Sequence, residues 1–410
     1  MTHTTIVNTT HTPIVPTGWT LRCAEWILPA HPDKLCDAIC DRFVGEAMRR
    51  EARALVGVEA AVHRSSVFIT GRIACADFES IDVEAIVRDV YRAAGYHPDC
   101  PPSPDALRIV TDLDIGPLCA DEARIRSISD DQSIITGYAQ STAASGGLPP
   151  EHVLARSIAK SLFNAIRASD CPATLGPDAK VLVLACESPD RSVFRLDQVT
   201  ISLQYCEFLA TYEDGLRVAR SVVDLVVERF SQEYPGFECN AKMKFLFNPC
   251  GDFACGGPLG DNGLAGKKLV VDYYGPRVPI GGGAMSGKDF WKVDRAGPLI
   301  AREVAQYCVA RFGLRACTVT LAISPGDRVF QIVNVDTHGG VALDCAVLAK
   351  SLTSGKRVDL RLSCKWKWFR QPTFATAALW GHFFEASLDR YVVQSATSEL
   401  AHELSERAIV

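Results

Sequence analysis

Lysines and acids gather in one glycine-rich stretch of the chain, residues 248–295. Within it, Lys267 and Lys268 on one side and Lys288 and Lys292 on the other flank a short apolar segment that predicts a strand. Glycine lets the backbone approach a ligand closely, and lysine supplies compact positive charge. This combination predicts a site for a polyphosphate with a bound metal ion. The alternative is a surface loop with solvated charges.

Residues 282–288 match the first seven positions of the phosphate loop G-x-x-x-x-G-K-[ST]. Asp289 replaces the Ser or Thr whose hydroxyl would bind the metal, and a strand directly before the loop is missing. A nucleotide-hydrolase loop is therefore not predicted. If residues 288–295 are helical, Lys288 and Lys292 share one face, an arrangement that costs energy unless an anion lies between them.

Length and composition describe a globular chain with more than one core. The chain has 410 residues, of which 48% are hydrophobic and 22% charged, and this favours two or three subdomains. The net charge of −5 gives no reason to expect a nucleic-acid partner or an acidic membrane surface. No apolar run reaches the roughly 18 residues of a membrane span, and the start of the chain does not resemble a signal peptide. Sixteen cysteines without a C-x-x-C pair favour free thiols and a cytoplasmic location.

Helices and strands can be predicted from the apolar pattern. Residues 31–50 predict a helix, residues 56–75 a β-hairpin, and residues 83–96 an amphipathic helix that ends at Gly95. This order is typical of an α+β unit. The polar, turn-rich residues 97–131 predict a long connection that is either functional or disordered.

Strands and helices continue to alternate through the rest of the chain. Further helices are expected at residues 150–169, 215–234, 299–313 and 345–352, and further strands at residues 181–186, 198–206, 318–324 and 329–336. Rounds of about 120 residues predict three related α+β subdomains. The expected divisions are a flexible tail at 1–20, subdomains at 21–127, 128–255 and 256–396, and a C-terminal tail at 397–410.

Three longer stretches resemble the signatures of the S-adenosylmethionine synthetase (methionine adenosyltransferase) family, in the same order. They are HPDKLCDAICD at 31–41, DDQSIITGYA at 130–139 and GGGAMSGKD at 281–289. Shorter matches lie at residues 177–180, 257–272, 292–295 and 375–383. The chain is thus identified as a divergent member of the family over roughly residues 20–385. The resemblance implies three α+β subdomains about a pseudo-threefold axis, with sheets inside and helices outside. It also implies a homodimer with shared active sites, or a tetramer of such dimers.

The resemblance also implies a reaction. Methionine sulfur attacks the ribose C5′ of ATP, and the intact triphosphate leaves and is hydrolysed to pyrophosphate and phosphate. Negative charge grows on the departing oxygen, so fixed cations aimed at the triphosphate lower the barrier. No protein nucleophile is needed, because positioning supplies much of the remainder. The family's cofactors are Mg²⁺, two ions per site, and K⁺.

Site residues follow by motif position. Catalytic contacts to the triphosphate would come from His31, Lys180, Lys267, Lys268 and Lys288. The rest of ATP would meet Asp131, Asp178, Phe253, Asp261 and Ala284. Mg²⁺ would be held by Asp33 and Asp294, and K⁺ by Glu59. Methionine would meet Asp261 and Lys292, with Arg72 and Thr111 at two further positions of the methionine pocket.

The methionine side departs from the family pattern. Arg72 stands where the family has the Glu that meets the methionine amino group, and Thr111 where it has a Gln. Asp252 replaces an Arg, so a mutual exchange of charge between Arg72 and Asp252 is one explanation. One alternative function is an adenosyltransferase for a different thioether or nucleophile, such as an acid without the amino group, because Arg72 favours anions. Another is a non-catalytic regulatory paralogue of a true synthetase.

Overall fold

The structure is a computed structural model that describes residues 15–168, 175–205, 211–340, 343–354, 358–360, 374–384 and 386–393. The chain divides into two compact units. Unit 1 comprises residues 1–31, 149–260 and 385–410, and unit 2 comprises residues 32–148 and 261–384. The predicted C-terminal tail and most of the predicted N-terminal tail lie outside the described residues.

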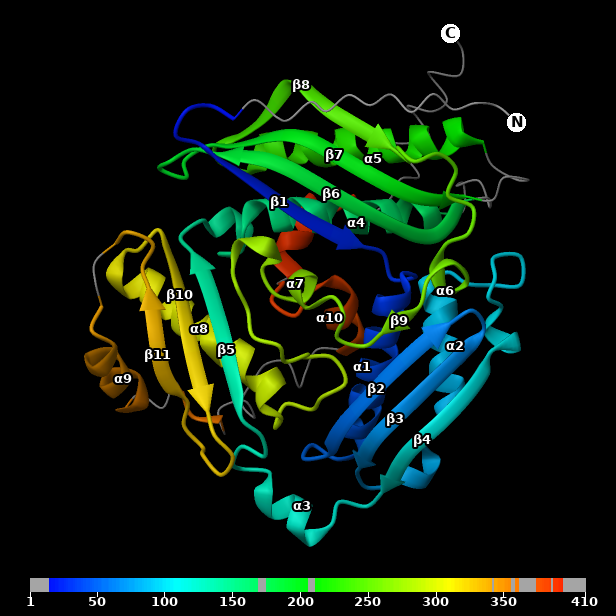
Figure 1. Ribbon diagram of the computed structural model, residues 1–410, viewed down its shortest axis with the longest axis vertical. Helices are drawn as coiled ribbons and strands as arrows, with labels where there is room; N and C mark the ends of the chain where they lie inside the picture. Colours follow the sequence, from blue (N-terminus) through cyan, green and yellow to red (C-terminus); the bar gives the residue numbers. More distant parts are fainter. Residues whose placement is uncertain are drawn as a thin grey trace. The chain divides into compact units, whose positions relative to one another are not determined.

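Unit 1 is built on one four-stranded sheet. Its strands, in spatial order, are β1 (Thr20–Ile27), β6 (Leu175–Glu187), β7 (Phe194–Tyr205) and β8 (Phe237–Phe247). β1, β6 and β7 pair antiparallel, whereas β8 pairs parallel with β7. Two helices, α4 (Pro150–Arg167) and α5 (Tyr212–Glu233), pack against the sheet (Figure 1). Along β7, buried Val199, Ile201 and Leu203 alternate with half-exposed residues, the period expected of a sheet covered on one face.

The first part of unit 2 is a second sheet with two helices. Its strands, in spatial order, are β4 (Arg108–Gly116), β3 (Ser66–Ala74), β2 (Leu55–His63) and β9 (Gly263–Leu264). α1 (Pro32–Arg50) packs against β2 and α2 (Val83–Ala94). β2 and β3 form the predicted hairpin, and Gly95 ends α2 with a positive φ of 112°, so both predictions are confirmed.

The second part of unit 2 is a three-stranded sheet covered by a long helix. Its strands, in spatial order, are β11 (Gln331–Asp336), β10 (Ala316–Ile323) and β5 (Ser133–Gln140). α8 (Val293–Phe312) packs against β5 and β10, and its Ile300 and Val304 join Val319 and Leu321 of β10 in one apolar core. A Cβ at Gly137 would collide with the backbone of α8, so glycine permits this close approach.

Shorter elements complete the described residues. They are α3 (Ala120–Ile125), α6 (Gly257–Gly260), α7 (Leu269–Asp272), α9 (Cys345–Ser354), α10 (Phe374–Trp380) and 3₁₀ turns that include Phe78–Ser80, Pro104–Ala106, Ala143–Ser145, Gly275–Arg277 and Ala386–Tyr391. Among the described residues, no helix combines the length and apolarity required to cross a bilayer. The thirteen cysteines in this part of the chain are free thiols, as the spacing predicts.

Two predictions of local structure are wrong, and the helix considered over residues 288–295 is present only from Val293. Residues 97–131 hold the strand β4 and the helix α3 rather than a structureless connection. The apolar segment after Lys268 is the helical turn α7, not a strand. Residues 288–292 are not helical, because Lys288 forms a β-bridge with Gly57 and α8 begins only at Val293. The fold is α+β as predicted, with helices against one face of each sheet.

Candidate active site

Two lysine-bearing loops lie against β2 in unit 2. The first lysine loop is residues 263–268, and the second lysine loop is residues 281–292. The first is attached through Ala265 N–H to Ala60 O, at 3.0 Å. The second is attached through Val58 N–H to Gly287 O, at 2.9 Å. A Cβ on Gly266 would lie only 2.7 Å from Ala284 Cβ, so the two loops are in contact.

The lysines of the first loop share one carboxylate. Asp33, in the first turn of α1, lies 3.7 Å from Lys267 Nζ and 3.3 Å from Lys268 Nζ. The carboxylate is buried, whereas both lysine side chains reach solvent. The structure therefore brings together three of the predicted residues, with one negative charge between two positive ones.

The second loop repeats this pairing. Lys288 Nζ lies 2.5 Å from Asp294 Oδ2, and Ser133 Oγ donates to the other oxygen of that carboxylate at 2.9 Å. Lys292 forms a short ion pair with Asp130. The site thus holds its lysines in ion pairs with carboxylates that come from other elements.

Asp33 and Asp294 are suitable ligands for a hard cation. Within the described residues, no group of three or more His, Cys, Asp or Glu side chains could hold a metal ion. Mg²⁺ does not need such a group, because it usually combines one or two carboxylates with substrate phosphates and water. The two carboxylates therefore fit Mg²⁺ that arrives with a phosphorylated substrate. Glu59 lies apart from them on β2, exposed and opposite Thr70 of β3.

Asp289 has a structural role, which explains why it replaces the hydroxyl residue of a phosphate loop. Its buried carboxylate accepts the N–H groups of Val56 and Trp291, each at 2.7 Å. It also forms a short ion pair with buried Arg126. This carboxylate fastens the second lysine loop to β2.

In unit 1, Lys180 lies within β6 beside the last residue of β1, and His31 follows β1. β1 and β6 pair so that Lys180 is opposite Ile27, and Lys180 Nζ lies 2.6 Å from Glu25 of the same sheet. Just after β1, Leu28 N–H donates to Ala179 O and His31 N–H donates to Leu28 O, both at 3.0 Å. The first bond extends the pairing of β1 with β6 by one residue, and the second closes a turn over residues 28–31 just before α1 begins.

Asp178 and Phe253 also lie in unit 1, joined to the segment that follows β8. Asp178 is buried and accepts Gly257 N–H at 2.7 Å, and Phe253 O accepts Tyr205 N–H at 3.1 Å. Asp252 accepts a short hydrogen bond from the Tyr205 hydroxyl.

The remaining predicted ATP contacts lie in loops of unit 2. Asp131 and Asp261 are exposed, and each accepts the N–H of the next residue through its own carboxylate at 2.8 Å. Ala284 lies at the contact between the two lysine loops.

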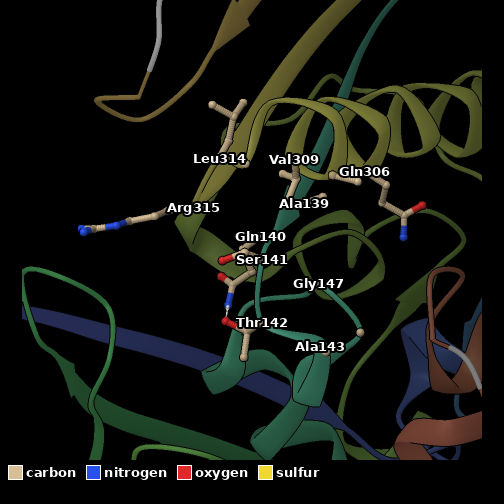
Figure 2. Close-up of a pocket in the computed structure, with 13 residues that line it drawn as sticks. Ala139, Gln140, Ser141, Thr142, Ala143, Gly147, Gln306, Val309, Leu314 and Arg315 are labelled. Atoms are coloured by element: carbon tan, nitrogen blue, oxygen red, sulfur yellow. Dashed lines mark hydrogen bonds between the residues drawn. The ribbon is translucent and has the colours of Figure 1, made fainter.

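A separate cavity of about 440 Å³ lies in unit 2, between the end of β5 and the end of α8 (Figure 2). Its lining comes from residues 139–147 and 306–315, and Arg315 is its one charged member. It contains none of the predicted site residues, so it is not the phosphate site.

Comparison with known proteins identifies the family. The models of the S-adenosylmethionine synthetase N-terminal, central and C-terminal domains match residues 20–113, 127–253 and 255–391. The chain belongs to the S-adenosylmethionine synthetase family. It is 32% identical to S-adenosylmethionine synthase 1 of Rhodospirillum rubrum over 88% of this chain and 92% of that protein. It is also 32% identical to the S-adenosylmethionine synthase of Rhodospirillum centenum and 30% identical to that of Mesoplasma florum, over 88% of this chain and 91% and 94% of theirs.

Arg72, the main departure from the family pattern, is neutralised inside unit 2. Its guanidinium makes two bonds to Glu122, at 3.0 and 3.1 Å, and one to Pro117 O at 2.9 Å. The hydrogen bond from Arg72 lowers the pKa of Glu122 to about 2. A Cβ at Gly116 would lie 3.1 Å from Arg72 Nη1, so glycine makes room for the guanidinium. No exchange of charge with Asp252 is needed to balance Arg72.

The structure does not bring Arg72 and Thr111 together. β3 and β4 pair so that Arg72 is opposite Asp114 and Thr111 is opposite Ile69. Because side chains alternate along a strand, Thr111 points to the other face of the sheet. The assignment of both residues to the methionine pocket stays a prediction.

Sequence reasoning missed the acids that pair with the lysines and the carboxylates that hold the loops. Asp130 and Glu25 pair with Lys292 and Lys180. Asp37 and Asp41 accept backbone N–H groups of the two lysine loops. The sequence did indicate Asp37 and Asp41, because aspartate recurs every fourth residue over residues 33–41 and must therefore line one face of a helix.

Proposed function

We propose that the chain synthesises S-adenosylmethionine from ATP and L-methionine. The methionine sulfur attacks C5′ of the ribose, and triphosphate leaves and is hydrolysed to pyrophosphate and phosphate. One observation carries the proposal: the solvent-accessible lysines of both loops are held in ion pairs with the carboxylates that suit Mg²⁺, Lys267 and Lys268 with Asp33 and Lys288 with Asp294.

When Mg²⁺–triphosphate binds, each lysine can exchange its aspartate for a phosphate oxygen, and each aspartate can exchange its lysine for Mg²⁺. Separating a lysine from its aspartate is costly if either charge is left without a counterion. A ligand that carries both signs prevents this cost, because its phosphate oxygens can take the lysines while its cation takes the carboxylates. Neither a free anion nor a free cation satisfies both partners. Asp33 and Asp294 would hold Mg²⁺, which would further neutralise the charge of the leaving triphosphate.

The lysines act as fixed cations for the departing group. Their charges would stabilise the negative charge that develops on the leaving oxygen, which is the largest contribution expected in a reaction without a protein nucleophile. His31 and Lys180 are proposed to contact the triphosphate as well. Asp131, Asp178, Phe253 and Ala284 are proposed to contact the nucleoside, Asp261 and Lys292 the methionine, and Glu59 the potassium ion.

We also propose a cytoplasmic homodimer. The face of the second sheet that α1 and α2 leave open carries an apolar row across its strands. Register places Leu264 of β9 and Phe68 of β3 opposite Ala61 of β2, and Val110 of β4 opposite Phe68. Leu264, Phe68 and Val110 are 49%, 43% and 40% exposed. A second copy would remove this row from water, which is the main driving force for stable association.

The alternative functions are not favoured. A thioether acid without an amino group would need a free cation at Arg72, but Glu122 and three backbone oxygens already occupy that guanidinium. A non-catalytic paralogue would have no need for paired lysines and carboxylates in both lysine loops.

The deciding experiment incubates the purified chain with ATP, Mg²⁺ and K⁺, with and without methionine, and analyses the products by mass spectrometry. Multiple turnovers of S-adenosylmethionine are expected only when methionine is present. Triphosphate release that requires another thioether would overturn the choice of substrate. Absence of any ATP turnover would overturn the enzyme proposal.

A further inference from the structure

One face of α1 carries three aspartates that bind the lysine loops through their backbone. Asp33, Asp37 and Asp41 recur every fourth residue, so their side chains line one face of the helix, and all three are buried. We call this set the aspartate row. Its members accept, in order, the N–H groups of Leu264, Gly266 and Gly287, at 3.0, 2.8 and 2.9 Å.

The row holds the peptide that immediately precedes a lysine in each loop. Gly266 precedes Lys267, and Gly287 precedes Lys288. The N–H groups of Gly266 and Gly287 lie outside strands and helices, so no backbone carbonyl of a sheet or helix accepts them. A carboxylate is the strongest acceptor that a side chain offers. The bonds therefore fix the points from which the lysine side chains extend.

Glycine allows the loops to come this close. Gly266 and Gly287 have positive φ values of 73° and 81°, a conformation that other residues rarely adopt. A Cβ at Gly287 would collide with Val58 O, and one at Gly263 would collide with Pro32 O at the start of α1. The glycine-rich composition of this stretch thus serves the contact with α1 and β2.

Buried cations balance the row. Lys34 Nζ lies 3.1 Å from Asp37 and forms a short ion pair with Asp272. Arg295 donates to both oxygens of Asp41, at 2.6 and 2.9 Å, and also to Lys288 O at 3.0 Å. Since Lys34 and Arg295 are buried and engaged, they do not compete with the exposed lysines for a phosphate.

We propose that Asp37 and Asp41 are positioning residues, which set the separation of Lys267 and Lys268 from Lys288 by anchoring the backbone of both lysine loops to one rigid helix. The inference rests on the proposed function only for the identity of the bound ligand. A loop held in this way needs no reorganisation when the triphosphate arrives, which is the condition for effective electrostatic stabilisation.

The test compares Asp37→Asn with Asp37→Ala. Both remove the charge, and Lys34 keeps Asp272 as its partner in each, but only Asn keeps an oxygen that can accept Gly266 N–H. Hydrogen exchange followed by mass spectrometry on peptides covering residues 263–268 reports the bond without any ligand. Exchange is expected to accelerate at least tenfold in Asp37→Ala and to stay within about threefold of the parent in Asp37→Asn.

Binding of Mg²⁺–tripolyphosphate, measured by calorimetry, gives the functional comparison. Affinity is expected to fall about tenfold or more in Asp37→Ala and to be largely retained in Asp37→Asn. Asp359→Ala is the matched control, because Asp359 is buried and pairs with Arg328 away from both loops. It should bind the ligand as the parent does. In turnover assays, KM for ATP should rise in Asp37→Ala, whereas loss of folded protein alone would lower kcat and leave KM unchanged.

Equal exchange rates and affinities in Asp37→Ala and the parent would overturn the proposal, and so would equal losses in the Ala and Asn variants. If Asp37→Ala does not fold, Asp37→Ser replaces it, since its hydroxyl is too short to reach Gly266 N–H. A parent that forms no S-adenosylmethionine would contradict the proposed function, while the exchange rates of the variants would still decide the role of the row.

Discussion

At the scale of single residues, Lys288 gives the most direct test of the partner-exchange scheme. Lys288→Met keeps the length of the side chain but removes the charge that would face the triphosphate, while Asp294 retains its bond from Ser133. We expect kcat/KM for ATP to fall about 10²–10³-fold, the usual loss when one fixed transition-state donor is removed. Lys350→Met, on an exposed position of α9, is the control and should leave turnover unchanged. Equal activity of the two variants would contradict the scheme.

Arg72 and Glu122 form the second residue-scale test. Arg72→Glu restores the residue type expected from the family, but it places two carboxylates side by side and should lower the thermal midpoint. The double variant Arg72→Glu with Glu122→Arg should recover about 1 kcal/mol of the loss in a double-mutant cycle. Hydrogen bonds to residues 114–122 already engage the Arg72 guanidinium, so it should not contact methionine. The KM for methionine should therefore change less than threefold in Arg72→Gln. A large rise in that KM would show that Arg72 contacts methionine.

Residue types were easier to predict from the sequence than residue partners. Lys267, Lys268 and Lys288 stand out as charges among glycines, and the structure places all three in loops that touch each other. Their partners come from distant parts of the chain: Asp33 precedes Lys267 by more than 200 residues. Only the tertiary fold brings such pairs together, so composition and spacing could not reveal them.

At the scale of elements, the contact of α1 with α7 predicts a pH dependence. Burial raises the pKa of Asp272 to about 7 and also raises the pKa of Asp37. Although burial opposes it, the pair of Asp272 and Asp37 holds the pKa of Lys34 above its usual range. Asp41 adds a further negative charge that raises the pKa of Asp272. The folded state binds the Asp272 proton more tightly than the unfolded state does, so the protonated acid adds to the free energy of unfolding. This contribution is complete below about pH 4 and is lost as the pH rises through about 7.

The measurement is the thermal midpoint at pH 5.5 and pH 8 in parent and Asp272→Asn. The neutral amide imitates the protonated acid and can still accept from Lys34. We expect the midpoint of the parent to fall by about 5 °C or more over this range, and that of Asp272→Asn to fall by much less. Parallel pH profiles would show that Asp272 does not titrate in this window.

Several elements with a clear apolar period were predicted well, whereas the strands β1, β4, β5 and β8 and the short α7 were not. α1, α2 and the β2–β3 hairpin follow their patterns closely. β4 was missed because its outward residues include Asp112 and Asp114, a type depleted in strands, and because its pairing with β3 is parallel and non-local. The four residues of α7 are too few for periodicity to separate a helical turn from a strand.

At the scale of the whole molecule, Phe68 tests whether the apolar row on the second sheet is an interface. Phe68→Glu places a charge in the centre of the row without disturbing the core, since this face lies opposite α1 and α2. In a homodimer each charge would be buried without a partner, so the variant should sediment as a monomer where the parent sediments as a dimer. Val347→Glu, on an exposed apolar residue of α9, is the matched control and should remain dimeric. A parent that is monomeric at micromolar concentration would contradict the homodimer. A Phe68→Glu variant that stays dimeric would place the interface elsewhere. If the monomeric variant still binds Mg²⁺–tripolyphosphate as the parent does, the lysine loops hold their geometry within a single chain.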